Sequence, residues 1–181
     1  MNRTLLILIS FISFGTLAGH ANCSPVQGRP ATQQQTDYCS NPPQWLGQNT
    51  QLELEINERV NAERAQQGLA PLQLNAQLNV AAQRHAINMG CQGVMAHNLD
   101  GQDAGQRMNA AGYSWSAWAE NVAMGYTSAP TVVAGWMNSP GHRANILDES
   151  SLDLTETGIG AFTGPDGRIY YCQVFARPGS R

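Results

Sequence analysis

The stretch WMNSPGHRANIL at residues 136–147 decides most of the fold, because one helix ends and another begins within it. Ser139 is a residue type that caps helix N-termini, and Pro140 directly after it suits the first helical position. Upstream, Pro130 stands where a separate helix would start and run into Trp136. We therefore predict two consecutive short helices in this part of the chain, the second ending at Leu147.

Three further helices are predicted on the N-terminal side. Residues 51–68 carry apolar side chains at a spacing of four, among charged ones, which is typical of an amphipathic helix. Asn75 can cap a second helix that runs to Met89 before two glycines. A short third helix is expected over residues 103–111, ending at a glycine.

The C-terminal part is predicted to be β-structure. Residues 157–163 and 168–176 flank Gly164-Pro165-Asp166-Gly167, whose residue types favour a turn between two strands. The stretch from Trp115 to Gly125 looks partly extended. Helices first and an antiparallel hairpin last indicate an α+β or layered α-β-α domain.

Composition excludes several classes of partner. The chain has 181 residues, 42% of them hydrophobic, so it can form a sizeable core. Its formal net charge is −3 and it contains no run of Lys or Arg. Nucleic-acid binding and attachment to anionic membranes both depend on clustered cations. The sequence therefore argues against either partner.

The first 50 residues do not read as part of the folded domain. Residues 1–21 combine an early Arg3, an apolar run and small residues near Ala21, which is typical of a secretory signal peptide. The apolar run is too short to span a bilayer. Residues 22–50 are rich in Gln, Pro and Ser and predict a flexible extension. We expect a secreted or periplasmic product with a domain over residues 51–181 and no stable membrane insertion after cleavage.

All four cysteines lie beyond the predicted cleavage point. An even number of cysteines in an exported chain predicts disulfides, and four cysteines allow three pairings. We favour Cys23–Cys39, which would close a small loop, and Cys91–Cys172, which would tie a helix end to the last strand. The sequence contains no Cys-x-x-Cys pair, so it does not indicate a zinc-cysteine site.

Several segments, in the same order, resemble the CAP superfamily of cysteine-rich secretory proteins, antigen 5 and pathogenesis-related 1, in its bacterial SCP-like form. Residues 60–89 look like the first two helices of that family. Residues 119–123, AENVA, resemble its Gly-Glu-Asn box with Ala119 in place of the glycine. Residues 136–147 match its Gly-His box closely. The resemblance extends over about residues 51–177 and implies a three-layer α-β-α sandwich with a small antiparallel sheet between helices.

The resemblance also implies a cavity lined by two histidines and two acidic residues. The histidines correspond to His97 and His142, and one acid corresponds to Glu120. Ser139 stands where the second acid is usual, so one carboxylate of the set is missing. Two imidazoles could hold Zn²⁺ through neutral nitrogens, with Glu120 as a third ligand or as an orienting group.

Two functions from different classes fit these residues. The first is a non-enzymatic extracellular binding module with a groove for a lipid, a cell-wall component or a protein. The alternative is a zinc-dependent hydrolase, most simply a peptidase, with His97 and His142 as ligands and Glu120 as base. The missing acid and the lack of a His-Glu-x-x-His helix favour the binding module. A structural or adhesive protein is a third class that the sequence leaves open.

Overall fold

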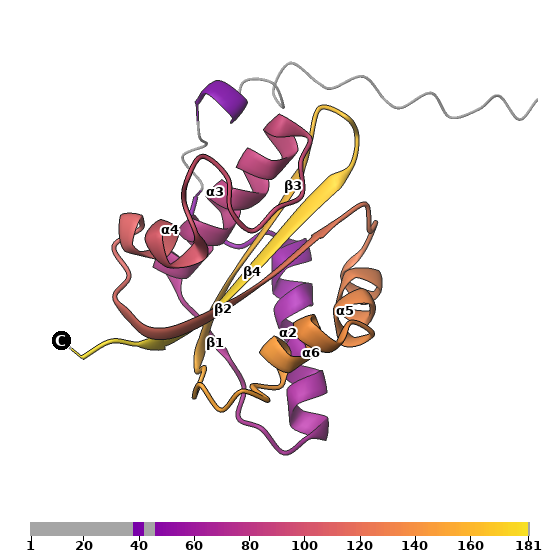
Figure 1. Ribbon diagram of the computed structural model, residues 1–181. Helices are drawn as coiled ribbons and strands as arrows, with labels where there is room; N and C mark the ends of the chain where they lie inside the picture. The colour runs from indigo at the N-terminus through magenta and orange to yellow at the C-terminus, as the bar shows by residue number, and fades with distance from the viewer. Residues whose placement is uncertain (1–37, 42–45, 181) are drawn as a thin grey trace, which may run out of the picture.

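A computed structural model describes residues 38–41 and 46–180 of the chain. A four-stranded sheet lies between two layers of helices (Figure 1), which confirms the predicted α-β-α sandwich. The helices are α2 (Gln51–Gln66), α3 (Ala76–Gln92), α4 (Ala104–Ala110), α5 (Ala129–Met137) and α6 (Pro140–Ile146). The strands are β1 (Gln73–Leu74), β2 (Trp115–Met124), β3 (Glu156–Thr163) and β4 (Ile169–Pro178), in the order β1-β3-β4-β2.

The sheet is mixed rather than purely antiparallel. Strands β2, β3 and β4 pair antiparallel, as the predicted hairpin requires. The two-residue strand β1 pairs parallel with β3. The chain between these two strands contains four helices and β2. A strand this short has little sequence pattern, so composition alone did not indicate it.

Local signals set most helix boundaries. The Asn75 side chain accepts hydrogen bonds from the backbone N–H of Gln77 and Leu78, so the predicted cap of α3 is confirmed. Asp103 and Gln106 form a reciprocal capping box at the start of α4. Ser139 is the N-cap residue of α6, but its side chain makes no capping hydrogen bond.

Strand β4 lies at the centre of the sheet and is buried on both faces. Alternate residues of a strand point to opposite faces. Tyr170, Cys172 and Val174 belong to the core under α3 and α4, whereas Tyr171 and Phe175 belong to the core under α2, α5 and α6. The two cores hold the helix layers on either side of the strand that carries Cys172.

Two glycines of β3 allow α3 to lie directly on the sheet. A Cβ atom at Gly158 would be 2.0 Å from the backbone carbon of Leu78, and one at Gly160 would be 2.5 Å from that of Ala82. Real Cβ atoms do not approach backbone this closely. The spacing between α3 and β3 therefore depends on the missing side chains at these two positions.

The predicted disulfide pairing is wrong. Cys91 bonds to Cys39, with the two Cα atoms 5.6 Å apart, and Cys172 is a buried free thiol. Cys172 pairs in register with Gly160, which contacts α3 at Ala82, and Cys91 lies nine residues further along the helix. At 1.5 Å per residue that is about 13 Å, well beyond the reach of a disulfide. Cys23 lies outside the described residues.

Part of the predicted N-terminal extension packs against α3. The backbone N–H of Gly47 donates to the Gln83 side chain at 2.7 Å, and the Gln83 amide donates to the carbonyl of Gln48 at 2.8 Å. Residues 38–40 are helical and carry the cysteine bonded to α3. The predicted signal peptide lies outside the described residues. Within the described part, none of the helices has the length and apolar character needed to cross a membrane.

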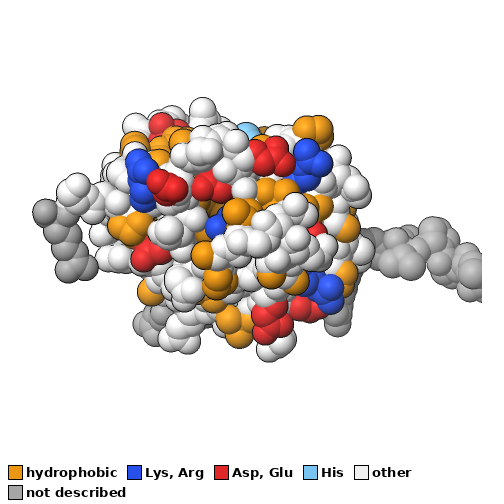
Figure 2. Space-filling view, turned by 90° about the horizontal axis from the view of Figure 1, so that it is seen from below, with side chains coloured by type: hydrophobic (Ala, Val, Ile, Leu, Met, Phe, Trp, Pro, Cys, Tyr) orange, Lys and Arg blue, Asp and Glu red, His pale blue; other side chains and the backbone are white. Residues whose placement is uncertain are grey.

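Charged side chains are dispersed on the surface. Figure 2 shows basic and acidic side chains lying beside one another on the face seen from below. Exposed pairs such as Arg59–Glu55 and Arg143–Glu149 illustrate this mixing. Such surface pairs contribute little to stability.

Candidate functional site

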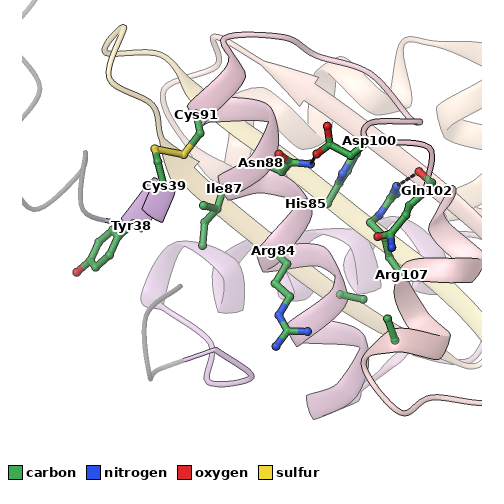
Figure 3. Close-up of a pocket in the computed structure, with 12 residues that line it drawn as sticks. Tyr38, Cys39, Arg84, His85, Ile87, Asn88, Cys91, Asp100, Gln102 and Arg107 are labelled. Carbon is green, nitrogen blue, oxygen red and sulfur yellow. Dashed lines mark hydrogen bonds between the residues drawn. A yellow bond between two sulfur atoms is a disulfide. The ribbon is translucent and has the colours of Figure 1, made fainter. Parts of the chain in front are cut away.

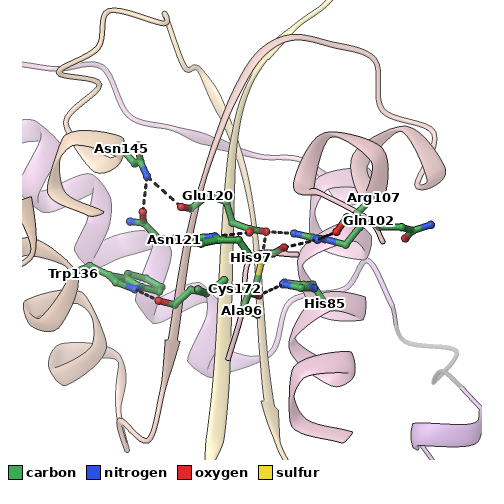
Figure 4. Close-up of polar contacts among 11 residues, drawn as sticks. His85, Ala96, His97, Gln102, Arg107, Glu120, Asn121, Trp136, Asn145 and Cys172 are labelled. Carbon is green, nitrogen blue, oxygen red and sulfur yellow. Dashed lines mark hydrogen bonds and ion pairs between the residues drawn. The ribbon is translucent and has the colours of Figure 1, made fainter. Parts of the chain in front are cut away.

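Glu120 is the centre of the site. It lies on β2, and its side chain is only 2% exposed. One carboxylate oxygen accepts a hydrogen bond from His97 Nδ1 at 2.9 Å. The other accepts from the Arg107 guanidinium and from the Cys172 thiol, whose sulfur is 3.3 Å away. Figure 4 shows these groups converging on the carboxylate, so its charge is stabilised by three donors.

Arg107 connects this carboxylate to the loop that carries His97. The arginine is on α4 and its side chain is 8% exposed. Its Nη1 donates to the carbonyls of His97 and Gln102, both at 2.9 Å, while Nη2 pairs with Glu120. Burial raises the pKa of Glu120, but the His97 hydrogen bond and the Arg107 charge outweigh it and lower that pKa overall.

His97 contacts Glu120 with one side of its ring and is otherwise largely exposed at the surface. Its side chain is 56% exposed, and Nδ1 is the ring nitrogen that contacts Glu120. The hydrogen bond to Glu120 raises the pKa of His97, against the opposing effect of burial. The chain therefore presents an imidazole at the surface that is oriented from behind by a carboxylate.

His142 and Ser139 come from the start of α6 on the other side of β2. Asn121 donates to the His142 carbonyl at 3.0 Å, and Asn145 donates to the Asn121 side-chain oxygen at 2.9 Å. These amides attach α6 to the strand that carries Glu120. Burial and the nearby charge of His97 lower the pKa of His142, so the two histidines interact electrostatically.

A hollow of about 250 Å³ adjoins His142 and Ser139. Most of its lining is apolar and comes from β2, α5 and the loop after α3. Met95 and Tyr126, which are 47% and 37% exposed, stand at its opening. The remaining lining residues are Val122, Ala123, Met124, Gly135 and Trp136.

Comparisons with known proteins agree with this arrangement. The family model described as "CAP: Cysteine-rich secretory protein family" matches residues 58–175. The chain belongs to the CAP family. This confirms the resemblance carried by the Glu120 and His142 segments. The match includes all the residues of the site described above.

Three relatives place this CAP domain among bacterial proteins. It is 33% identical over 132 residues to the uncharacterized protein YkwD of Bacillus subtilis (strain 168), covering 72% of this chain and 49% of YkwD. An extracellular SCP-domain protein of Bacillus anthracis is similar in structure, with a TM-score of 0.63, 25% identity, and coverage of 69% and 40%. An outer surface protein of Borrelia burgdorferi shares the fold, with a TM-score of 0.65, 23% identity, and coverage of 72% and 96%. The chain thus spans about half the length of YkwD.

The structure of the CAP domain brings some of the predicted residues together and separates others. His97 and Glu120, which the resemblance assigned to one cavity, are in direct contact. His142 and Ser139 line the neighbouring hollow, and neither side chain is hydrogen-bonded to Glu120. We had expected the Ser139 hydroxyl to cap α6, but it makes no such bond. The Asn145 side chain donates to the Glu120 carbonyl at 3.2 Å.

Sequence reasoning missed Arg107, Met95 and Cys172 as members of the site. Nothing near Arg107 in the sequence distinguishes it from a surface arginine of a short helix. Met95 follows a helix end and looked like part of a connector. Cys172 was assigned to a disulfide, so its contact with Glu120 was not considered. Arg107 and Cys172 are found only when β2, β4 and α4 are placed together, and Met95 only when the loop after α3 is placed beside β2 and α5.

The side chains of this site do not form a ligand set that fits a zinc ion. Glu120 is already bound by His97, Arg107 and Cys172, and a buried guanidinium beside the carboxylate supplies the positive charge. Within residues 38–41 and 46–180, no three His, Cys, Asp or Glu side chains are grouped as a metal site. Catalytic zinc sites offer three protein ligands. We derive no reaction step through a metal.

A ¹⁵N NMR titration is expected to show that the pKa values of the two histidines are shifted in opposite directions. The pKa of His97 should lie above its ordinary 6.5 and that of His142 below it. Charging His97 therefore stabilises the fold fully below pH 6.5, and this contribution is lost as the pH rises through its folded-state pKa. The neutral form of His142 contributes to the stability of the fold above pH 6.5, and this contribution is lost as the pH falls through its folded-state pKa.

A Glu120→Gln variant is the control for this titration. It removes the negative charge beside His97, so the pKa of His97 should fall toward its ordinary value. The pKa of His142 should stay below 6.5, because burial is its main cause. A pKa of His97 that is the same in the wild type and in Glu120→Gln would contradict the described contact.

Proposed function

We propose that this CAP domain is a secreted, non-enzymatic binding module that holds an apolar ligand, such as a lipid acyl chain, in the hollow beside His142. The chain carries a disulfide, which persists in oxidising compartments, and one of its structural neighbours is described as extracellular. These two features, together with the signal-like residues 1–21, support the proposed secretion of this chain.

The observation that carries the proposal is the composition of the hollow. Pockets for small molecules are lined mainly by apolar and aromatic side chains with a few polar groups. Here Met95 and Tyr126 supply exposed apolar surface at the opening, and Trp136 forms part of the wall. The polar lining groups are Ser139 and His142, which suit the headgroup end of an amphipathic ligand.

The state of Glu120 supports binding over hydrolysis. A general base must reach the proton that it removes. Both oxygens of this carboxylate are occupied by donors, and the side chain is nearly inaccessible. The peptidase alternative required Glu120 as the base, so it loses the group on which it depended.

Replacing Met95 with glutamate is expected to weaken binding of a dansyl-labelled fatty acid by at least about tenfold. The substitution removes an apolar contact worth on the order of 1.5–3 kcal/mol when fully buried and adds a charge at the opening. Fluorescence titration of the purified protein measures the effect. Val94→Glu is the matched control, because Val94 is 45% exposed on the same loop but does not line the hollow. Equal loss in both variants, or none in Met95→Glu, would contradict the proposal.

Calorimetric titration with Zn²⁺ separates the two candidate functions. We expect the wild type and a His97→Ala, His142→Ala variant to give similar heats, with no binding tighter than about 10 μM, roughly −7 kcal/mol. The physical reason is the lack of a third free ligand beside the two imidazoles. Micromolar binding that vanishes in the double variant would restore the hydrolase alternative.

A further inference from the structure

A second pocket, of about 290 Å³, lies on the other side of Arg107 from the Glu120 site. It is enclosed by α3, α4, the loop around Asp100 and the segment tied down by the Cys39–Cys91 disulfide (Figure 3). Its volume is close to the lower end of small-ligand pockets, roughly 300–1,000 Å³. The proposed acyl-chain hollow is lined by a different set of residues.

Two buried polar atoms of residues that line this pocket have no hydrogen-bond partner within residues 38–41 and 46–180. They are His85 Nδ1 and Arg107 Nε, in side chains that are 1% and 8% exposed as residues. Buried polar groups are nearly always satisfied, so each such atom calls for a partner. Both atoms belong to side chains that line the pocket, and a ligand contacts them once the lining atoms that cover them move aside.

The chemistry of these two atoms is complementary. His85 Nε2 lies 2.8 Å from the Ala96 carbonyl, which can only accept, so Nε2 carries the proton. Among the described residues, no carboxylate is hydrogen-bonded to His85, and burial lowers the pKa of its ring, so the ring is neutral and Nδ1 is an acceptor. Arg107 Nε is a donor. A hydroxyl group both accepts and donates, so a ligand with neighbouring hydroxyls can satisfy both atoms.

Arg84 places a positive charge in the lining of the pocket, which favours a negatively charged ligand. It is exposed, lines the pocket, and forms no ion pair or hydrogen bond with the residues described. Asp100, the acidic group of the lining, is already bound by the amides of Asn88 and Gln92 at 2.9–3.2 Å. Figure 3 shows Arg84 extending away from Asp100. A guanidinium without a partner is well suited to a carboxylate.

We propose that the pocket beside the Cys39–Cys91 disulfide binds a small hydroxylated carboxylate, the class to which uronic acids belong. The hydroxyls would contact His85 Nδ1 and Arg107 Nε, and the carboxylate would contact Arg84. This site is independent of the proposed acyl-chain hollow, so either one can be correct without the other.

Calorimetry with D-glucuronate, D-glucose and propionate tests the proposal on the oxidised protein. We expect glucuronate to bind with a Kd of about 1 mM or tighter. Glucose, which lacks the carboxylate, and propionate, which lacks the hydroxyls, should bind at least about tenfold more weakly. Glucuronate that fails to saturate the protein by about 20 mM, or equal binding of either fragment, would overturn the proposal.

Arg84→Gln and ring ¹⁵N NMR locate the binding. Arg84→Gln should weaken glucuronate binding at least about tenfold, whereas Arg59→Gln, an exposed arginine on α2, should leave it unchanged. The His85 Nδ1 resonance should shift on saturation, because its lone pair gains a hydrogen bond, and the His142 resonances should stay in place. Equal affinity in the two arginine variants, or a shift at His142 rather than His85, would show that the pocket is not the site.

Discussion

Arg107→Met is expected to lower the free energy of unfolding by about 3–5 kcal/mol, the usual cost of removing one partner of a buried ion pair. The substitution would leave the Glu120 carboxylate, 2% exposed, without its cation. Urea unfolding at pH 7 measures the loss. As a matched control, Arg177→Met removes an exposed pair with Asp153 and should cost less than about 1 kcal/mol.

The pH dependence of this loss has a definite sign. The folded-state pKa of Glu120 is below its ordinary value of 4.5, so its contribution to stability is present above pH 4.5 and is lost as the pH falls through the folded-state pKa. The difference between wild type and Arg107→Met should therefore shrink in acid. Adding Glu120→Gln to Arg107→Met should recover part of the stability at pH 7. A single variant within about 1 kcal/mol of wild type would contradict the buried pair.

Gly158→Ala is the substitution with the second largest expected effect, a destabilisation of about 3 kcal/mol. The new Cβ would lie 2.0 Å from the backbone of α3, which cannot move aside as a flexible side chain could. The helix must shift away from β3, and the wall of the disulfide-side pocket would shift with it. Thermal and urea unfolding both report the change.

Gly141→Ala is the matched control for this substitution. Gly141 lies in α6, and an added Cβ there would meet no atom within 4 Å. Alanine should therefore be neutral or stabilising by up to about 1 kcal/mol. If the two alanine variants unfolded at the same urea concentration, the close contact between α3 and β3 would be disproved.

Arg107 has a part in both candidate sites. Its Nη atoms bind the His97 loop and Glu120, while its Nε is without a partner among the described residues and its side chain lines the pocket beside the Cys39–Cys91 disulfide. A ligand that hydrogen-bonds to Nε would touch the same guanidinium that orients the His97–Glu120 pair. The NMR titration of His97 can therefore be repeated with glucuronate present to measure any coupling between the sites.

Local chemistry in the sequence determined the helix ends and the terminal hairpin. Asn75 and Asp103 cap helices through backbone groups two or three residues away, and Gly164–Gly167 turns between paired strands. These interactions are short in sequence, so residue type and spacing are enough to predict them. The ordered segments around Glu120 and His142 also identified the family, and with it the expectation that His97 and Glu120 line one cavity.

Only the tertiary structure decided which distant groups meet. Glu53 is one of the charged residues between the apolar positions of residues 51–68, yet it is fully buried and accepts a hydrogen bond from the Ala161 backbone, 108 residues away. Cys91 pairs with Cys39, and Arg107 rather than a metal faces Glu120. Such pairings depend on strand register and on how closely α3 lies on the sheet. The strand register and the distance between α3 and the sheet cannot be predicted from residue spacing within one segment, because both are set by the packing of all the layers together.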